Sequence, residues 1–479
     1  MSSSIFKSLA VLSVKMAVIS VMIQGPAATA AETTVVPSTQ NTTPSTTQPQ
    51  QVILTPEFLR HQVLEGNLSL EQELNIIKDQ KDKMNVARGQ LLPSLNLGML
   101  ISSGPSFLLS SISFLLPFLF PSNWMALDAA TDQFNAEKIS YKILEMNVYS
   151  SSLSMYYTVL ADAKIQKIYE QQAKDLMNIY TIKKMQFDLI GIVTPQDLEQ
   201  TLASAQLAQV SASQLKELAA QETAALRQVL GLPLATEIEF TAQNMPGSDW
   251  ENKPIAQAVL QAFSVAPENQ QIDFLIAAAK AKDLSADFGF LNTATLSASG
   301  SGGSGATLGN LAGGVSFHFG FDYFPNLNLT ERSILEIQLQ KRQLGLQITQ
   351  TLESVTKSLV EANRQFSLAS QAEVEMTNVY NTIKLNYDLG LTELINVLTA
   401  HVQLVQASVA RVKAEQDLNQ QRVSLHRVMI TDQFSLIKGC AIMPKKKHGG
   451  LGGLIGGIFG DSDPDKTIDQ MCIEGGVRK

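Results

Sequence analysis

The residue types that most often carry catalysis or metal binding are few in this chain and lie far apart. Five histidines occur in 479 residues, and no two of them have the spacing of a zinc site. The Gly/Ser run at 300–305 lacks the Gly-Lys-Ser/Thr ending of a phosphate-binding loop, so we interpret it as a flexible loop. We therefore expect no enzymatic activity, no cofactor and no metal site. The histidines are His61, His318, His401, His426 and His448.

The two cysteines, Cys440 and Cys472, both lie near the C-terminus. In an oxidising compartment they are expected to form a disulfide that closes a loop of about 30 residues. Redox sensing or metal binding by these thiols is the alternative, but no second thiol pair accompanies them.

The N-terminus predicts export. Lys7 and Lys15 precede an apolar run at 17–23, and Ala28 and Ala30 place small residues where a signal peptidase cuts, so residues 1–30 are predicted to be a signal peptide. The run is far shorter than the ~20 residues of a spanning helix. Without the two lysines, the chain keeps 34 basic against 44 acidic residues, a formal charge of −10. This acidic balance argues against nucleic acid as a partner.

The rest of the chain contains a duplication with a period near 200 residues. Asn178-Ile179-Tyr180 recurs as Asn378-Val379-Tyr380, and Phe187-Asp188-Leu189 recurs as Tyr387-Asp388-Leu389. Further on, Gln206-Leu207-Ala208-Gln209 matches Gln403-Leu404-Val405-Gln406. We place the two repeats at about 54–233 and 254–433.

Each repeat has the same predicted order of elements. A helical lead, about 56–91 or 254–287, is followed by a strand-like segment and then by a very long helix. The stretches 128–189 and 331–389 contain no proline, and apolar residues recur in them at heptad-like spacing. A Gly turn then leads into a return helix, about 196–230 or 391–430.

The segments 93–120 and 290–324 alternate between apolar and polar residues, as strands of a membrane barrel do. The alternative is a small periplasmic β-domain with one buried face. Four strands cannot close a barrel, because the smallest barrels have about eight. Three subunits would supply about twelve strands and leave no open edge. A trimer is therefore expected if these strands enter lipid.

This duplicated order resembles the TolC family of outer-membrane factors. The resemblance covers residues 54–433 and is carried by Leu91-Leu92-Pro93-Ser94-Leu95, by Asn123-Trp124-Met125-Ala126-Leu127 and by the two turns that contain Gly191 and Gly390. It implies a mixed α+β membrane protein: a trimeric twelve-stranded outer-membrane β-barrel continued by a long periplasmic α-helical barrel. Residues 31–53 would be a flexible lead-in rich in Ser, Thr, Pro and Gln, and residues 434–479 an irregular Gly-rich tail.

The resemblance also implies a function. Such proteins are passive exit ducts in the outer membrane of Gram-negative bacteria, reaching into the periplasm. They form homotrimers in contact with outer-membrane lipid and serve an inner-membrane pump through a periplasmic adaptor, or membrane fusion protein, in efflux or type I secretion. Gly191 and Gly390 would lie in the helical turns that contact the adaptor.

The family closes the periplasmic entrance of the duct by contacts near these turns. Asp197 and Tyr387 match an Asp and a Tyr of that closure, and we expect a hydrogen bond between them. Thr392 stands where the family has an Arg, and Asn396 and Thr399 stand where it has two pore-lining Asp residues. Rings of Asn and Thr carry no fixed charge, so cations should block the channel only weakly at this entrance, and the latch should be weaker than in the family.

One class of protein without a pore stays open as an alternative. A periplasmic coiled-coil structural or adhesin-like protein would also contain long helices with heptad-like spacing. Trimers that change mobility on heating, with β-structure retained after outer-membrane extraction, would distinguish the channel from this alternative.

Overall fold

The computed structural model describes residues 51–91, 120–190, 193–288, 295–297, 314–316, 323–443 and Cys472. All of them belong to one compact unit, Pro49–Lys479. The predicted signal peptide 1–30, the strand segment 93–119, most of 290–324 and Gly191 lie outside the described residues.

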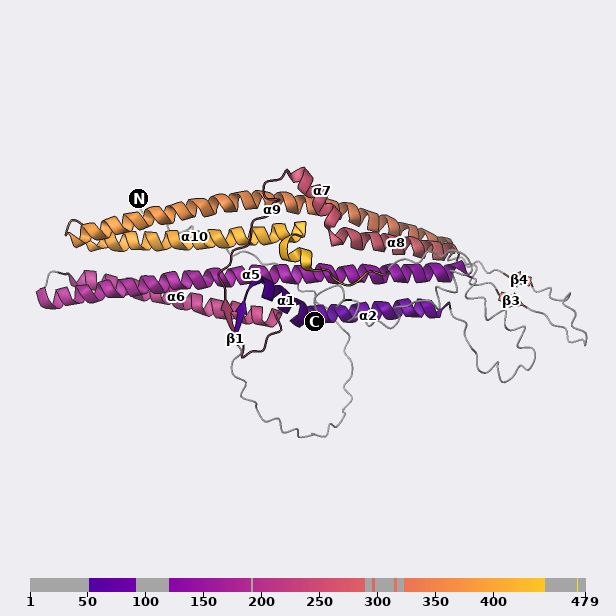
Figure 1. The fold of residues 1–479 in the computed structure, drawn as a ribbon, viewed down its shortest axis with the longest axis horizontal. Coiled ribbons are helices and arrows are strands. Elements are labelled where there is room, and N and C mark those ends of the chain that lie inside the picture. Colours follow the sequence, from indigo (N-terminus) through magenta and orange to yellow (C-terminus); the bar gives the residue numbers. More distant parts are fainter. Residues whose placement is uncertain are drawn as a thin grey trace, which may run out of the picture. The chain divides into compact units, whose positions relative to one another are not determined.

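The described helices repeat the same order twice, as the duplication predicts (Figure 1). A pair of shorter helices precedes a very long helix, and a return helix runs back beside the long one. In the first repeat these are α1 (Pro56–Gly66), α2 (Leu68–Gly89), α5 (Pro121–Ile190) and α6 (Pro195–Val229). In the second repeat they are α7 (Ile255–Val265), α8 (Pro267–Asp287), α9 (Tyr323–Asp388) and α10 (Leu394–Met429).

The long helices α5 and α9 contain 70 and 66 residues, so each is roughly 100 Å long at ~1.5 Å per residue. Both begin earlier than the proline-free stretches suggest. Pro121 and Pro325 lie in the first helical turn, where the missing N–H has no intrahelical partner to lose.

The turns at the ends of the long helices form from local sequence. At the end of α9, Gly390 has φ +74°, the Gly390 N–H donates to the Tyr387 carbonyl at 2.9 Å, and the Leu391 N–H donates to the Asn386 carbonyl at 2.8 Å. This is a Schellman motif, which ends α9. Helix α10 then begins at Leu394, whereas the sequence predicts the return helix from about 391. The α6 helix begins at Pro195 and is capped by Thr194, whose hydroxyl accepts from the Asp197 N–H at 3.2 Å.

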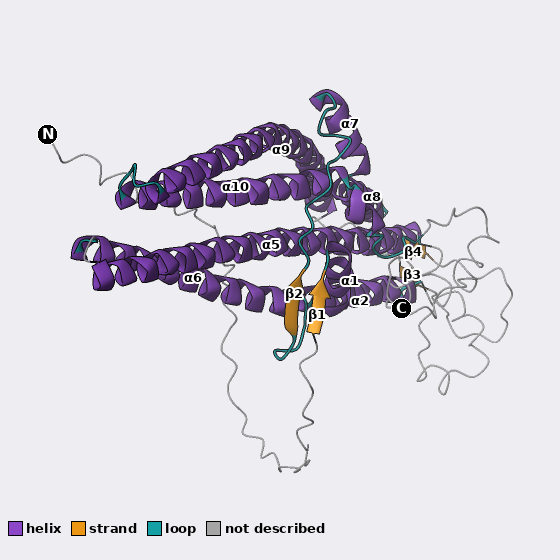
Figure 2. Ribbon diagram, turned by 60° about the vertical axis from the view of Figure 1, so that its left-hand side comes forward, coloured by secondary structure: helices purple, strands orange, loops and turns teal. Residues whose placement is uncertain are grey.

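Two short strand pairs accompany the helices (Figure 2). β3 (Thr295–Ser297) and β4 (Gly314–Ser316) pair antiparallel with Leu296 opposite Val315, within the segment predicted as strands. β1 (Gln51–Leu54) and β2 (Glu237–Phe240) pair in parallel. The strand at Gln51–Leu54 differs from the flexible lead-in expected for residues up to 53.

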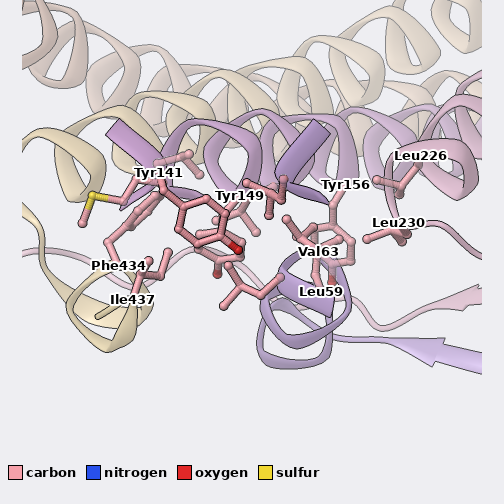
Figure 3. Packing of buried hydrophobic residues seen from close by; sticks show 14 of the residues in the cluster. Leu59, Val63, Tyr141, Tyr149, Tyr156, Leu226, Leu230, Phe434 and Ile437 are labelled. Atoms are coloured by element: carbon pink, nitrogen blue, oxygen red, sulfur yellow. The ribbon is translucent and has the colours of Figure 1, made fainter. Parts of the chain in front are cut away.

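The largest core cluster lies where α1, α2 and α6 meet the middle of α5 (Figure 3). Tyr149 and Tyr156 of α5 are fully buried in it, together with Leu59 of α1 and Leu226 of α6. Among the helices that the structure describes, none has a stretch long and apolar enough to cross a bilayer.

The residues after α10 belong to this core, which differs from the irregular tail expected from Phe434 onward. A 3-10 helix, η4 (Asp432–Leu436), places the Phe434 ring against Tyr149 with 5.0 Å between the ring centroids. The buried Lys138 ammonium donates to the Ala441 carbonyl at 2.8 Å. Cys440 is also buried, and a disulfide joins it to Cys472.

The two repeats differ in how well their long helices are covered. Helix α5 packs against α1, α2 and α6 of its own repeat and also against α8 and α10 of the other. In the described chain α9 packs mainly against α7, α8 and α10, all from its own repeat. The neighbours that α5 receives from the second repeat therefore have no counterparts from the first repeat on α9.

Candidate functional site

The two helical hairpins, α5–α6 and α9–α10, turn at the same end, and the candidate site lies there (Figure 1). A small apolar cluster joins all four helices. It contains Leu176 from α5, Ala205 from α6 and Leu394 from α10, and Tyr387 of α9 packs against it. The hairpins are thus fixed to each other near their turns.

A cleft of about 680 Å³, which we call the tip cleft, opens beside this cluster. Its walls come from α5 and α9, and the first residues of α10 also line it. Two predicted gate residues, Tyr387 and Thr392, line the tip cleft, and so does Gly390. The complete lining is Asp175, Asn178, Ile179, Ile182, Lys183, Gln186, Tyr380, Lys384, Tyr387, Asp388, Gly390, Thr392, Leu394 and Val397.

Lys183 links two residues of the predicted latch. Its ammonium group lies 4.4 Å from the centroid of the Tyr387 ring, a cation–π contact. Burial lowers the pKa of Lys183, and the nearby Asp197 carboxylate opposes this shift. Lys183 therefore interacts with both Asp197 and Tyr387, while the hydrogen bond between those two residues stays a prediction.

The other predicted gate residues lie at the start of α10. Asn396 and Thr399 are exposed, and neither lines the tip cleft. The Asn396 amide donates to the Thr392 hydroxyl at 2.9 Å, and the Thr399 hydroxyl donates to the Ile395 carbonyl at 2.7 Å. All three side chains are neutral, so this segment of α10 presents hydrogen-bonding groups without a fixed charge.

Several residues around the tip cleft had no individual role in the sequence-based prediction. Lys183, Lys384 and Asp175 bring charge to it, and Tyr380 brings an aromatic ring. Of these four residues, only Tyr380 had a sequence signal, because it belongs to the repeated Asn-x-Tyr triplet. Lysines and aspartates on a long helix are usually solvated, and only packing brings these from α5 and α9 to one cleft.

Comparison with known proteins identifies the fold. No family model matches the chain, and no curated protein matches it by sequence. Solved structures do match. The Campylobacter jejuni CmeC outer membrane channel is 14% identical with a TM-score of 0.60, and the match covers 83% of this chain and 94% of that one. The outer membrane protein VceC of Vibrio cholerae is 15% identical with a TM-score of 0.59, covering 78% and 95%.

A third solved structure matches over similar shares of both chains. A membrane protein from Pseudomonas aeruginosa is 14% identical with a TM-score of 0.62, and the match covers 78% of this chain and 93% of that one. At these identities the likeness concerns the fold. The chain thus has the fold of outer-membrane channel proteins, and the helical part of the fold expected from the TolC resemblance is confirmed, while the twelve-stranded barrel and the trimer stay predictions.

Proposed function

We propose that the chain is one subunit of a trimeric outer-membrane exit duct, which passively conducts substrates delivered by an inner-membrane pump and a periplasmic adaptor. The fold shared with outer-membrane channels supports this proposal. The observation that carries it is the uncovered surface of α9, because another copy of the chain can supply the neighbours that the duplication predicts for it.

The duplication makes this argument quantitative. Shifting by the repeat period of 200, Leu339, Leu346 and Val360 of α9 correspond to Ile139, Met146 and Leu160 of α5. The α9 residues are 62%, 73% and 58% exposed, whereas their α5 counterparts are 3%, 0% and 7% exposed. Burying one such side chain contributes about 1.5–3 kcal/mol, so this row of α9 is a strong candidate for a subunit contact.

The missing neighbours also define how the copies would meet. Within one chain, α5 receives α8 and α10 from the second repeat. The equivalent neighbours of α9 are α2 and α6 of an adjacent subunit. Such a contact joins two different surfaces, so it repeats head to tail, and it forms a ring where the rotation between neighbours closes. With four strands per subunit, a ring of three would carry the ~12 strands of a closed barrel.

The proposed entrance lies at the turns of the hairpins. Asn396 and Thr399 would form uncharged rings around the axis, the Asp197–Tyr387 bond would help to close them, and Gly191 and Gly390 would mark turns that contact the adaptor. The predicted N-terminal signal peptide and the Cys440–Cys472 disulfide fit an exported protein.

The test is reconstitution of the full chain from outer-membrane extracts. Mass measurement in detergent should give a homotrimer, and planar bilayers should record stable ion conductance. A monomer that produces no conductance would contradict the duct and favour the coiled-coil structural protein.

A further inference from the structure

Helix α10 contains two buried histidines with different surroundings. His426 is 3% exposed, and both ring nitrogens have partners: Nδ1 lies 2.7 Å from the Thr431 hydroxyl and Nε2 lies 3.0 Å from the Pro246 carbonyl. His401 is 4% exposed, but its Nδ1 has no hydrogen-bond partner among the residues that the structure describes. A buried ring nitrogen without a partner is uncommon and suggests a role beyond packing.

His401 lies where the two hairpins meet. Its ring stacks on Tyr380 of α9, with 5.0 Å between the centroids and 24° between the planes. Its Nε2 lies 3.9 Å from an Asp175 carboxylate oxygen of α5. Tyr380 and Asp175 both line the tip cleft, so the histidine ring contacts residues of both long walls.

Burial favours the neutral form of His401, and the two nearest charges oppose each other, with the Asp175 carboxylate the stronger of the two. Burial is the main cause that lowers the pKa of His401, and the Lys384 ammonium of α9 acts in the same direction. The Asp175 carboxylate of α5 opposes them. Beyond the ring, Asp388 of α9 influences Tyr380. Helix α6 has no charged residue between Glu199 and Lys216, so it supplies no counter-charge there.

We propose that His401 is an acid-sensitive contact that fastens the two hairpins while its ring is neutral and loosens them when the ring takes up a proton. The inference rests on the proposed function, because loosening at the turns would ease the opening of the periplasmic entrance. The first hairpin lacks such a group, since the repeat register places Ser204 at the position equivalent to His401.

The direction of the pH effect follows from proton linkage. A histidine whose pKa is lowered on packing binds fewer protons in the closed junction than in the opened one. The junction therefore has its full stability above the ordinary histidine pKa of 6.5. It loses stability as the pH falls below that value towards the lower pKa of the packed ring.

Amide hydrogen exchange of the trimer tests the junction directly. After correction for intrinsic exchange rates, protection of the first turns of α10 should fall by up to about tenfold per pH unit below pH ~6.5, the slope for uptake of one proton. His401→Phe keeps the ring stack and His401→Ser copies the first repeat, and both should abolish this slope. His61→Phe, which replaces a partly exposed histidine of α1, should keep it. A slope that persists in both His401 variants overturns the proposal.

Conductance separates this inference from the proposed function. Wild-type channels in planar bilayers should have a higher open probability at pH 5.5 than at pH 7.5. In His401→Phe the ratio of these two open probabilities should fall to about one. If both proteins conduct ions with the same pH dependence, the result contradicts the role of His401 but leaves the duct unaffected. Absence of conductance in every variant at both pH values contradicts the duct itself.

Discussion

At the scale of single residues, the carboxyl groups of Asp162 on α5 and Glu222 on α6 lie close enough to influence each other's pKa. Burial raises the pKa of both groups, and the proximity of Asp162 contributes to raising the pKa of Glu222 to about 7. Two carboxylates this close cannot both ionise cheaply, so the pair retains a proton near neutral pH.

The pair makes helix packing depend on pH. A raised carboxyl pKa contributes stability that is fully present below the ordinary value of 4.5 and is lost as the pH rises through about 7. We predict that Glu222→Gln stabilises the protein at pH 8, because it removes one of the two neighbouring carboxylates. The gain should be on the order of 1 kcal/mol, since solvent reaches part of this site and screens the charges. At pH 5 the substitution should have less effect, because the pair then already holds its proton.

Thermal unfolding at both pH values measures this difference. Glu217→Gln on the same helix is the matched control, because Glu217 is exposed and accepts a hydrogen bond only from Gln221 in the described chain. An equal effect of both substitutions at pH 8 would contradict the shared proton.

The predicted latch also belongs to the residue scale. Tyr387→Phe removes the hydroxyl but keeps the ring under the Lys183 ammonium. If the Asp197–Tyr387 hydrogen bond closes the entrance, this change should raise the open probability of single channels severalfold, since a net hydrogen bond is worth about 0.5–1.5 kcal/mol. Tyr380→Phe, beside the same cleft, is the control, and an unchanged open probability in Tyr387→Phe excludes the latch.

At the scale of elements, two Schellman motifs end helices of the hairpins but differ in their surroundings. Gly390 has φ +74° and a Cβ added there would meet nothing within 4 Å, whereas one added at Gly231, with φ +63°, would lie 2.1 Å from the Gly66 carbonyl oxygen. The turn after α9 therefore needs glycine only for its backbone conformation. The turn after α6 needs it for conformation and space.

Three alanine substitutions test this distinction by chemical denaturation. Gly390→Ala should cost about 1–2 kcal/mol for the left-handed conformation alone. Gly231→Ala should cost more than that, because backbone atoms at Gly66 must move as well. Gly345→Ala within α9 should stabilise by about 0.5–1 kcal/mol, because the nearest atom, of Phe263, would be 3.6 Å from the new Cβ. Equal costs at Gly231 and Gly390 would contradict the close contact at Gly66.

At the scale of the whole molecule, assembly depends on the uncovered row of α9. We predict that Leu346→Glu, which changes a side chain that is 73% exposed in the single chain, leaves the subunit folded but prevents the trimer. A charge buried at a subunit contact without a partner costs several kcal/mol. Mass photometry measures the oligomer, and circular dichroism measures the helix content.

Leu234→Glu is the control for this prediction. Leu234 is 90% exposed in the turn after α6, away from the α9 row, so its replacement should leave the trimer intact. Trimers of normal stability in Leu346→Glu would show that α9 has no subunit contact at this position.

The sequence by itself determined the order of the elements. The duplicated triplets at Tyr180 and Tyr380, the heptad-like spacing and the Gly turn at Gly390 predicted the long helices and their return helices, and the structure has them. These features depend on residues a few positions apart, which a sequence pattern records directly. The parallel strands β1 and β2 escaped prediction, because four-residue strands from distant parts of the chain carry almost no local signal.

Only the tertiary structure decided which side chains meet. Nothing in the spacing of Asp175, Tyr380 and His401 indicates that three helices bring them together, or that Lys183 contacts Tyr387. Their meeting depends on how α10 packs against α5, which is set by side-chain volumes along the whole interface. The unequal cover of α5 and α9 has the same origin, because two repeats with the same order of elements fold alike but have different neighbours.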